Sequence, residues 1–346
     1  MAKKITMEYI ANKLGISKNT VSLALRNMPG VSMQTRKLVC NMAKQFGYEY
    51  KKNLRNNVLG KNSLHNNICL ILSKDTASSE GFFSHIQYGI ESEARKNNLN
   101  TILHCFDEKN EKFETPLSIK NNMVAGIVTL GKVSKKTASN IIKLNLPLVM
   151  IDHYFDDLKS DYVLTDNQSG GYLAAEHLIK LGHRNIGFSG NTNASNSFFD
   201  RFEGFKKAIK DHGFTLDESL CITQKSMAEL INNGVEAVVL ELKKLPKLPS
   251  AFFCCNDIEA VSVIKALTAM GISVPKDISV IGFDNIESSR SFFPELTTMH
   301  ISKERMGERA VKKLVSKIKN EESFQEKILM PATLVVRQST AVLKNA

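Results

Sequence analysis

The sequence predicts an α/β protein in which a small all-helical head precedes a larger body made of two doubly wound lobes. Two observations support this fold class. Residues 5–47 contain three short amphipathic helical patterns, each preceded by a residue that can cap a helix. From Asn67 onward, apolar strand patterns alternate with amphipathic helical patterns, and a second such set begins near Tyr162. Two successive sets of this kind indicate two sheets, each covered by helices.

The head has the spacing of a helix-turn-helix motif. Thr6, Ser17 and Ser32 are placed to cap its three helices. Gly15, between the first two helices, tolerates the left-handed backbone that a tight turn often needs. When two helices are joined by three or four residues with Gly at the bend, the second helix can enter the major groove of DNA. An unspecialised three-helix bundle would show the same spacing.

The charge of the head distinguishes these two interpretations. Residues 1–62 contain 12 Lys or Arg and only two acids, Glu8 and Glu49, so they carry +10 of the chain's net charge of +11. A solvated helical surface usually mixes its signs, whereas a one-sided excess on a small helical unit suits a polyanion. The head is therefore predicted to bind DNA.

The body is predicted to contain strands and helices in regular alternation. The continuous apolar run Ile68–Leu72 is typical of a parallel strand that is buried on both faces. Further strands are expected at 100–105, 126–130, 147–151, 186–189, 218–223, 237–240, 251–255 and 279–283. Helices are expected at 82–97, 116–122, 135–144, 167–181, 200–212, 227–233 and 257–270.

Two patterns in the body could mimic catalysis. Gly126–Lys132 spells GxxxxGK, but Val133 replaces the Ser or Thr that would hold magnesium, and the residues between the glycines resemble a strand. Asp152 and His153 end a strand without a Ser or Cys nucleophile elbow nearby. No cluster has the spacing of metal ligands. We therefore expect no enzymatic activity, no cofactor and no metal.

The cellular compartment of the protein is predicted from its N-terminal residues, the length of its apolar stretches and its cysteines. The N-terminal residues run straight into the head without an apolar secretory segment. No stretch approaches the roughly 18 to 20 apolar residues that span a membrane. Most of the six cysteines lie in apolar runs, where Cys is a small buried hydrophobe. These features predict a cytoplasmic protein with reduced thiols.

Characteristic stretches run through almost the whole chain. In the head they are Ile5–Ala11, Leu14–Ser22 and Pro29–Ser32. In the body they are Phe82–Phe83, Gly89–Glu91, Thr165–Asn167, Gly170–Gly171, Leu181–His183, Arg201–Phe205, Cys255–Asp257, Pro275–Asp284 and Pro294–Thr298. With these stretches the sequence resembles the lactose/galactose repressor family of bacterial transcription regulators. The resemblance implies that the head reads a DNA operator, and that the lobes form a type I periplasmic-binding-protein fold with a ligand cleft at their junction.

The resemblance also implies a domain layout. The helix-turn-helix domain would cover residues 1–50, a hinge residues 51–66, and the effector-binding and dimerisation domain residues 67–340. In this family the chain crosses between the lobes three times, and we expect the crossings near 162–166, 286–293 and 320–328. The first lobe would then comprise about 67–163 and 292–320, and the second about 164–291 and 321–340.

The resemblance places DNA-contacting residues on the second helix and in the hinge. Lys18 and Asn19 match the family's base-reading pair, and their side chains can pair with guanine and with adenine. A third reader, often Arg, falls at Leu23, which could at most touch a thymine methyl. Asn57 occupies the place of the family's Leu wedge, so minor-groove kinking is in doubt. Hydroxyl groups suited to phosphate, and an outward-facing cation, complete the set: Thr6, Ser17, Thr20, Ser22 and Arg26.

The same alignment nominates effector-binding residues. The planar fork of Arg201 can hold a hydroxyl pair, a carboxylate or a phosphate. Asp284 can accept hydrogen bonds from two vicinal sugar hydroxyls, and Asn256 can both donate and accept. The remaining candidates are Ser73 and Asp152, which end strands of the first lobe, and Phe82 or Phe83, which could stack on a sugar. The alternatives are a surface ion pair for Arg201, a turn role for Asp284, and core packing for the two phenylalanines.

The predicted function is that of a dimeric transcription regulator, most often a repressor in this family. Two heads on a palindromic operator double the contacts that one head makes. The predicted effector is a small molecule, in this family commonly a sugar or sugar derivative. Two alternatives are a secreted sugar-binding protein of the same fold, which the basic head argues against, and a nucleotide-dependent sugar enzyme, which a turnover assay would reveal.

Overall fold

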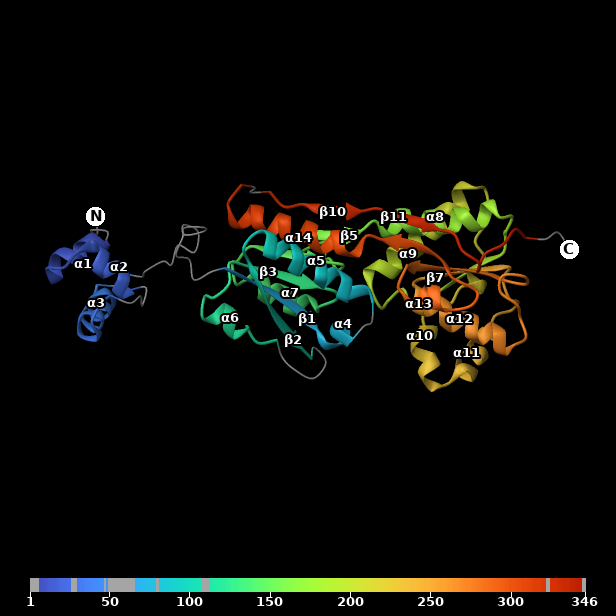
Figure 1. Ribbon diagram of the computed structural model, residues 1–346, viewed down its shortest axis with the longest axis horizontal. Helices are drawn as coiled ribbons and strands as arrows, with labels where there is room; N and C mark the ends of the chain where they lie inside the picture. Colours follow the sequence, from blue (N-terminus) through green and yellow to red (C-terminus); the bar gives the residue numbers. More distant parts are fainter. Residues whose placement is uncertain are drawn as a thin grey trace. The chain divides into compact units, whose positions relative to one another are not determined.

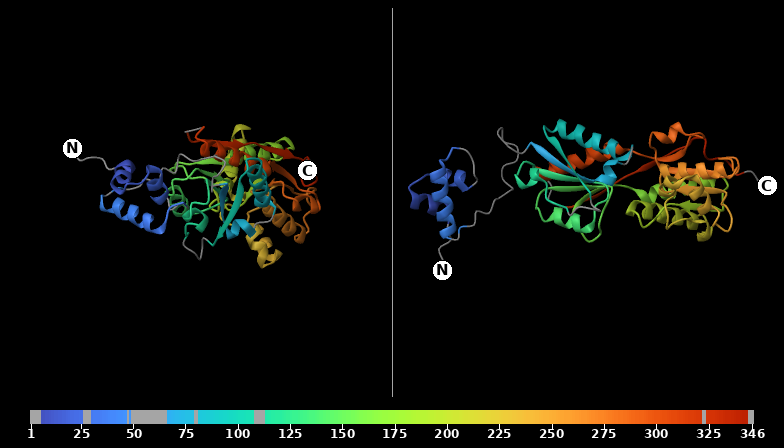
Figure 2. Two further views of the ribbon diagram at one scale, coloured as in Figure 1. Left: turned by 60° about the vertical axis from the view of Figure 1, so that its left-hand side comes forward. Right: turned by 90° about the horizontal axis from the view of Figure 1, so that it is seen from below.

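The chain forms two units, which Figures 1 and 2 show from three sides. The computed structural model describes residues 6–25, 30–46, 48, 66–78, 81–107, 113–321 and 324–343. One unit covers residues 1–57, and the other covers residues 58–346. In the described ranges no helix combines the length and apolar composition that a membrane crossing requires.

The head consists of α1 (Met7–Leu14), α2 (Lys18–Leu25) and α3 (Met33–Gln45). All three predicted caps are confirmed. Thr6 Oγ1, Ser17 Oγ and Ser32 Oγ each accept a hydrogen bond from the backbone N–H three residues on, over 3.2, 3.0 and 3.1 Å. Gly15 has the expected left-handed backbone, with φ of +63°. The small core of the head is formed by Ile10, Ala11, Val21, Ala24, Val39 and Ala43.

The first lobe is built on a six-stranded parallel sheet in the order β10-β5-β4-β3-β1-β2. The strands are β1 (Asn67–Ser73), β2 (Asn100–Phe106), β3 (Gly126–Leu130), β4 (Leu148–Ile151), β5 (Asp161–Thr165) and β10 (Lys327–Met330). The helices are α4 (Lys74–Ser78), α5 (Phe82–Lys96), α6 (Leu117–Lys120), α7 (Lys135–Ile142) and α14 (Lys303–Ile318). Alternate β1 residues pack on opposite faces, Leu70 with α5 and α14 and Ile71 with α6 and α7. This explains why the strand is apolar from Ile68 to Leu72.

The second lobe is built on a five-stranded sheet in the order β11-β9-β8-β7-β6, in which only β11 runs antiparallel. The strands are β6 (Ile186–Ser189), β7 (Ala251–Cys254), β8 (Ser279–Asp284), β9 (Thr297–Ile301) and β11 (Ala332–Val335). The helices are α8 (Asn167–Lys180), α9 (Asn196–Asp211), α10 (Met227–Leu230), α11 (Val235–Leu242), α12 (Asp257–Ala269) and α13 (Ser288–Ser291), with 3-10 turns η1 (Glu218–Leu220) and η2 (Ile231–Asn233). One face of the sheet packs on α8 and α9, and the other on α10, α11 and α12.

Three element predictions were wrong. The expected strand at 237–240 is part of helix α11, because Val238 and Leu242 bury one face while Leu240 remains 63% exposed. The expected strand at 218–223 is reduced to the turn η1 and a single bridge between Ile222 and Ser189. Helix α9 begins at Asn196, four residues earlier than expected, since Ser195 Oγ caps it.

Two of the three lobe crossings also differ from the expectation. The first lies between β5 and α8, within the expected range. The second follows β9, at Ser302, because β9 pairs with β8 and keeps the chain in the second lobe beyond residue 293. The third is at Pro331, between β10 of the first sheet and β11 of the second. Figure 1 shows these last two strands running from one lobe to the other.

Each lobe contains one pair of helices that cross at glycines. An ideal Cβ on Gly171 of α8 would lie 2.2 Å from the carbonyl oxygen of Arg201 on α9, and one on Gly204 would lie 2.0 Å from that of Gln168. In the first lobe, Gly89 and Gly307 bring α5 and α14 equally close. The second-lobe contact fixes the helix that carries Arg201.

Substituting Gly171 with Ala should therefore destabilise the body. The new methyl group must displace a backbone carbonyl, and such overpacking typically costs about 1–3 kcal/mol. Urea denaturation of Gly171→Ala and of Ser169→Ala, an exposed position on the same helix, provides the measurement. We expect a lower midpoint for the first variant and a change within about 0.5 kcal/mol for the second. Equal midpoints would show that α8 and α9 can separate without cost.

Candidate functional site

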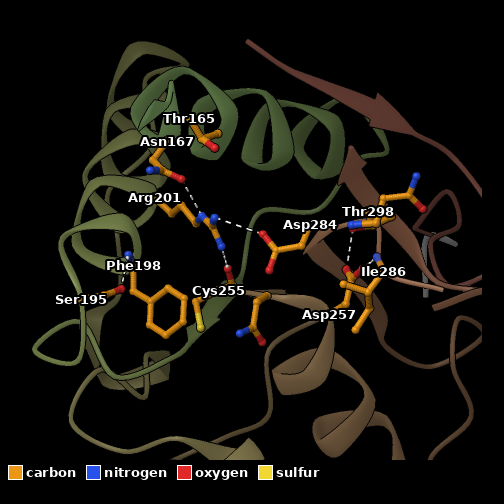
Figure 3. Close-up of polar contacts among 12 residues, drawn as sticks. Thr165, Asn167, Ser195, Phe198, Arg201, Cys255, Asp257, Asp284, Ile286 and Thr298 are labelled. Carbon is orange, nitrogen blue, oxygen red and sulfur yellow. Dashed lines mark hydrogen bonds and ion pairs between the residues drawn. The ribbon is translucent and has the colours of Figure 1, made fainter. Parts of the chain in front are cut away.

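Arg201 lies at the centre of a buried polar cluster in the second lobe (Figure 3). Its Nε–H donates to Oδ1 of Asn167 over 2.9 Å, and its Nη1 donates to the carbonyl oxygen of Cys255 over 2.6 Å. Its Nη2 lies 3.1 Å from Oδ1 of Asp284. Because Arg201 is only 2% exposed, the alternative of a surface ion pair was wrong.

Two aromatic rings flank the guanidinium of Arg201. Its central carbon lies 3.8 Å from the ring centre of Phe283 and 5.7 Å from that of Phe198. Cation–π contacts of this kind are stronger when the cation is removed from water. The rings, the two hydrogen-bond acceptors and the ion pair with Asp284 together hold the guanidinium in one orientation.

Asp284 ends β8 and begins a constrained turn. Its φ is +103° and that of Asn285 is +51°, a region that side-chain-bearing residues rarely adopt. The Asn285 N–H donates to Oγ1 of Thr298 over 3.3 Å, and Arg337 Nη2 donates to the Asn285 side-chain oxygen over 2.6 Å. The turn role foreseen as an alternative for Asp284 is therefore real, and its carboxylate still faces Arg201.

Three acidic side chains, Asp152, Asp257 and Asp284, lie in this region within reach of the charges of Arg201 or Lys303. Burial raises the pKa of Asp152 to about 7, with a smaller opposing effect from Arg201, and burial also raises the pKa of Asp257 to about 7. The pKa of Asp284 is raised by burial, although Arg201 and Lys303 act in the opposite direction. The cluster therefore offers more hydrogen-bond acceptors than cations to pair with them.

The Asp152 carboxyl should make stability depend on pH. Its folded pKa of about 7 exceeds the ordinary 3.8, so between these values the folded state holds the proton that the unfolded state has lost. The free energy of unfolding should thus fall as pH rises from about 4 to about 7, and then level off. We expect Asp152→Asn to remove roughly 1–3 kcal/mol of this decline. Urea titrations at pH 4.5 and 8 measure it, and parallel curves for both proteins would contradict the assignment.

The other predicted effector residues take structural contacts in this structure. Asn256 Oδ1 caps α12 by accepting from the Glu259 N–H over 2.8 Å, directly beside the Cys255 carbonyl that contacts Arg201. Ser73 Oγ caps α4 by accepting from the Thr76 N–H over 3.2 Å. Phe82 is 8% exposed and packs edge-on against Phe83, with 4.9 Å between the two ring centres. The core-packing alternative therefore describes Phe82.

Sequence reasoning missed several members of the cluster. Asn167 and Asp257 belong to the stretches that carry the resemblance, but nothing in the pattern identifies their partners. Asp257 is buried and accepts from the Ile286 N–H over 2.9 Å and from Thr298 Oγ1 over 2.5 Å. Lys303 is 7% exposed and donates to the carbonyl oxygens of Asp284 and Asn285 over 2.5 and 3.1 Å. A lysine in the first turn of a polar helix gives no signal of burial.

Side chains of both lobes meet beside this cluster. Lys132 Nζ of the first lobe donates to the Ala194 carbonyl of the second over 2.6 Å, and Asn196 Nδ2 donates back to the Tyr154 carbonyl over 2.9 Å. A pocket of about 470 Å³ opens here. Its lining includes His153, which follows Asp152, and Asn196, which lies on the same helix as Arg201.

In the head, most of the predicted DNA-contacting residues that the structure describes lie on α2 or cap it, and Thr6 caps α1. Ser17, Lys18 and Asn19 are exposed, and Lys18 Nζ lies 3.6 Å from the Glu8 carboxylate. Thr6 is also exposed, whereas Thr20, Ser22 and Leu23 are half-buried. Val21 and Ala24 face the core of the head, which leaves the other side of α2 for a ligand. Arg26 and Asn57 lie outside the described residues.

Known proteins resemble this chain in both parts. Residues 6–50 match the family described as bacterial regulatory proteins, lacI family, and residues 175–340 match the periplasmic binding protein-like domain. The HTH-type transcriptional repressor PurR of Mannheimia succiniciproducens is 30% identical over 96% of this chain and 98% of its own length. The ribose operon repressor of Haemophilus influenzae is 28% identical over 98% and 99%.

Solved structures agree on the fold. A LacI family transcriptional regulator from Enterococcus faecium with bound ribose has a TM-score of 0.67 and 30% identity, covering 80% of this chain and 100% of that one. The lac repressor dimer bound to operator and the anti-inducer ONPF has a TM-score of 0.66 and 22% identity, covering 98% and 100%. The predicted helix-turn-helix head and two-lobed body are thereby confirmed. The chain belongs to the lacI family of bacterial regulatory proteins and is a transcriptional regulator rather than an enzyme.

Proposed function

We propose that the protein is a dimeric cytoplasmic repressor that binds a palindromic operator and is controlled by an uncharged sugar bound near Arg201. The buried pair of Arg201 and Asp284, with the half-buried Asp152 within reach of their charges, is the observation that carries the choice of ligand. Carboxylates that accept from vicinal hydroxyls, beside a fixed guanidinium that donates to a ring or hydroxyl oxygen, suit a polyhydroxylated ligand.

The electrostatics favour an uncharged sugar over a sugar phosphate. The Nε, Nη1 and Nη2 atoms of Arg201 already face acceptors within the protein. The ammonium of Lys303 is engaged by two carbonyl groups. A phosphate at this place would compete with the Asp284 carboxylate for Arg201, and repulsion between the two anions in a water-poor site is costly.

The known relatives support the same assignment. A regulator of the same family with 30% identity has ribose bound, and a relative with 28% identity is a ribose operon repressor. The lac repressor, which has the same fold, has been solved as a dimer bound to its operator. Because one head makes few contacts, a two-fold dimer on a palindrome is the arrangement that gives tight specific binding.

A thermal-shift series should identify the class of ligand. We expect D-ribose or another uncharged sugar to raise the melting temperature of the full chain, and D-ribose 5-phosphate to have little effect at the same concentration. Ligand at 100 times its Kd stabilises the folded state by about 2.7 kcal/mol, which is a shift of a few degrees. A shift produced by the phosphate alone would overturn the choice of an uncharged ligand.

A further inference from the structure

Lys303 connects the two lobes beside the buried polar cluster of Arg201 and Asp284. Its Nζ donates to the carbonyl oxygens of Asp284 and Asn285, in the turn after β8 of the second lobe. The side chain itself belongs to the first residue of α14, directly after the crossing at Ser302. An ammonium has three hydrogens and no acceptor, so these two carbonyls take most of its hydrogen-bonding capacity.

The backbone of Lys303 is fixed to the first lobe. Helix α14 packs on α5 and on strands β3, β4 and β5 of that lobe. The carbonyl of Glu304, the next residue, lies so close to Gly89 of α5 that an ideal Cβ there would be 2.1 Å away. The first turn of α14 therefore cannot shift relative to α5 without separating the two helices.

Most other polar contacts of the turn at Asp284 come from its own lobe, while the buried side chain of Ile286 lies beside Gly81 at the start of α5 in the first lobe. Thr298 and Arg337 contact Asn285, and Arg201 faces the Asp284 carboxylate. Another first-lobe contact nearby, between His85 and Glu287 at 3.9 Å, involves an exposed carboxylate and contributes little. Lys303 thus supplies buried hydrogen bonds that tie this turn to the first lobe, in addition to the apolar contact of Ile286.

We propose that Lys303 is a positioning residue that couples the Asp284 turn to the orientation of the first lobe. The proposal rests on the proposed function, because it takes Asp284 as a ligand-binding group. A ligand that draws on the Asp284 carboxylate shifts the adjoining carbonyls, and a buried ammonium is too costly to leave without partners. Helix α14 and the α5 packed on it then follow the turn. The first lobe is also the one that the chain enters from the head, at β1.

Hydrogen–deuterium exchange of the ligand-free full chain gives the first test. We expect Lys303→Met to speed amide exchange at least three-fold both in the turn at 284–287 and in the first turns of α5 at 82–90. Lys303→Arg should restore most of the protection, and Lys312→Met, an exposed position on α14, should change neither segment. If Lys303→Met does not fold, Lys303→Gln serves in its place. Faster exchange in the turn alone, or in neither segment, overturns the proposal.

The second test uses D-ribose as the probe. In the wild-type protein, saturating D-ribose should slow exchange in both segments. In Lys303→Met, D-ribose at a concentration that saturates the variant should protect 284–287 but not 82–90. Protection of 82–90 equal to wild type at that concentration overturns the coupling role. If D-ribose leaves the wild-type protein unchanged, the sugar assignment fails at this probe, while the ligand-free test still decides the role of Lys303.

Discussion

Replacing Arg201 with Ala is expected to abolish the response to effector while the head still binds its operator. The guanidinium contacts Asn167, Cys255 and Asp284, so its removal leaves buried acceptors and a carboxylate without their cation. Breaking a buried pair in this way typically costs about 3–5 kcal/mol of stability. A ligand that has lost these contacts cannot be held, and a site that binds no ligand cannot be coupled to DNA.

The measurement combines urea denaturation with operator titration, with and without the sugar found by thermal shift. Lys210→Ala, an exposed position on the same helix α9, is the matched control and should behave as wild type. We expect Arg201→Ala to bind the operator with an affinity within a few-fold of wild type at all sugar concentrations, at a temperature where it remains folded. A wild-type response at wild-type sugar concentrations would remove Arg201 from the site.

Loss of the head should eliminate DNA binding and leave sugar binding intact. Residues 1–62 carry +10 of the chain's net charge of +11, and the two units separate near residue 57. If the intact dimer neutralises six to ten phosphates, its affinity should fall roughly 10³- to 10⁵-fold between 50 and 200 mM salt. A fragment of residues 63–346 should show no DNA binding in a fluorescence titration and the same sugar-induced thermal shift. An affinity that hardly changes with salt would exclude the electrostatic account.

The variant Asn19→Ala tests whether the Asn19 side chain contributes to the preference of the head for its operator sequence. Asn19 is exposed at the start of α2, so the substitution removes a candidate base contact without disturbing the core of the head. We expect sequence preference to weaken by about 1–3 kcal/mol while the salt dependence stays unchanged, because base contacts specify and phosphate contacts position.

Local patterns in the sequence were sufficient to predict helices that begin at a nearby capping residue and strands that are buried on both faces. Thr6, Ser17 and Ser32 cap their helices because capping depends only on residues three positions away. Continuous apolar runs became strands that are covered on both faces. The run at 237–240 has the same composition, yet it forms a helix because only one of its faces meets α12.

Long-range pairing was harder to predict, and so were most contacts of the site. The pairing of β9 with β8 moves the second crossing to Ser302, and no local signal specifies that pairing. The resemblance placed Arg201 and Asp284 in one site, and the structure shows their side chains 3.1 Å apart. The partners of Arg201 come from three other segments, and the burial of Lys303 depends on a turn nearly 20 residues earlier.

The late position of β10 and β11 has a consequence for synthesis on the ribosome. Each of these strands forms one edge of a sheet, and both lie at 327–335, after the rest of both lobes. Neither sheet can be completed until nearly all of the preceding chain has been made, whereas the head can fold as soon as it emerges. A truncated protein that ends before residue 327 would therefore carry a DNA-binding head attached to an effector domain that lacks an edge strand in both lobes.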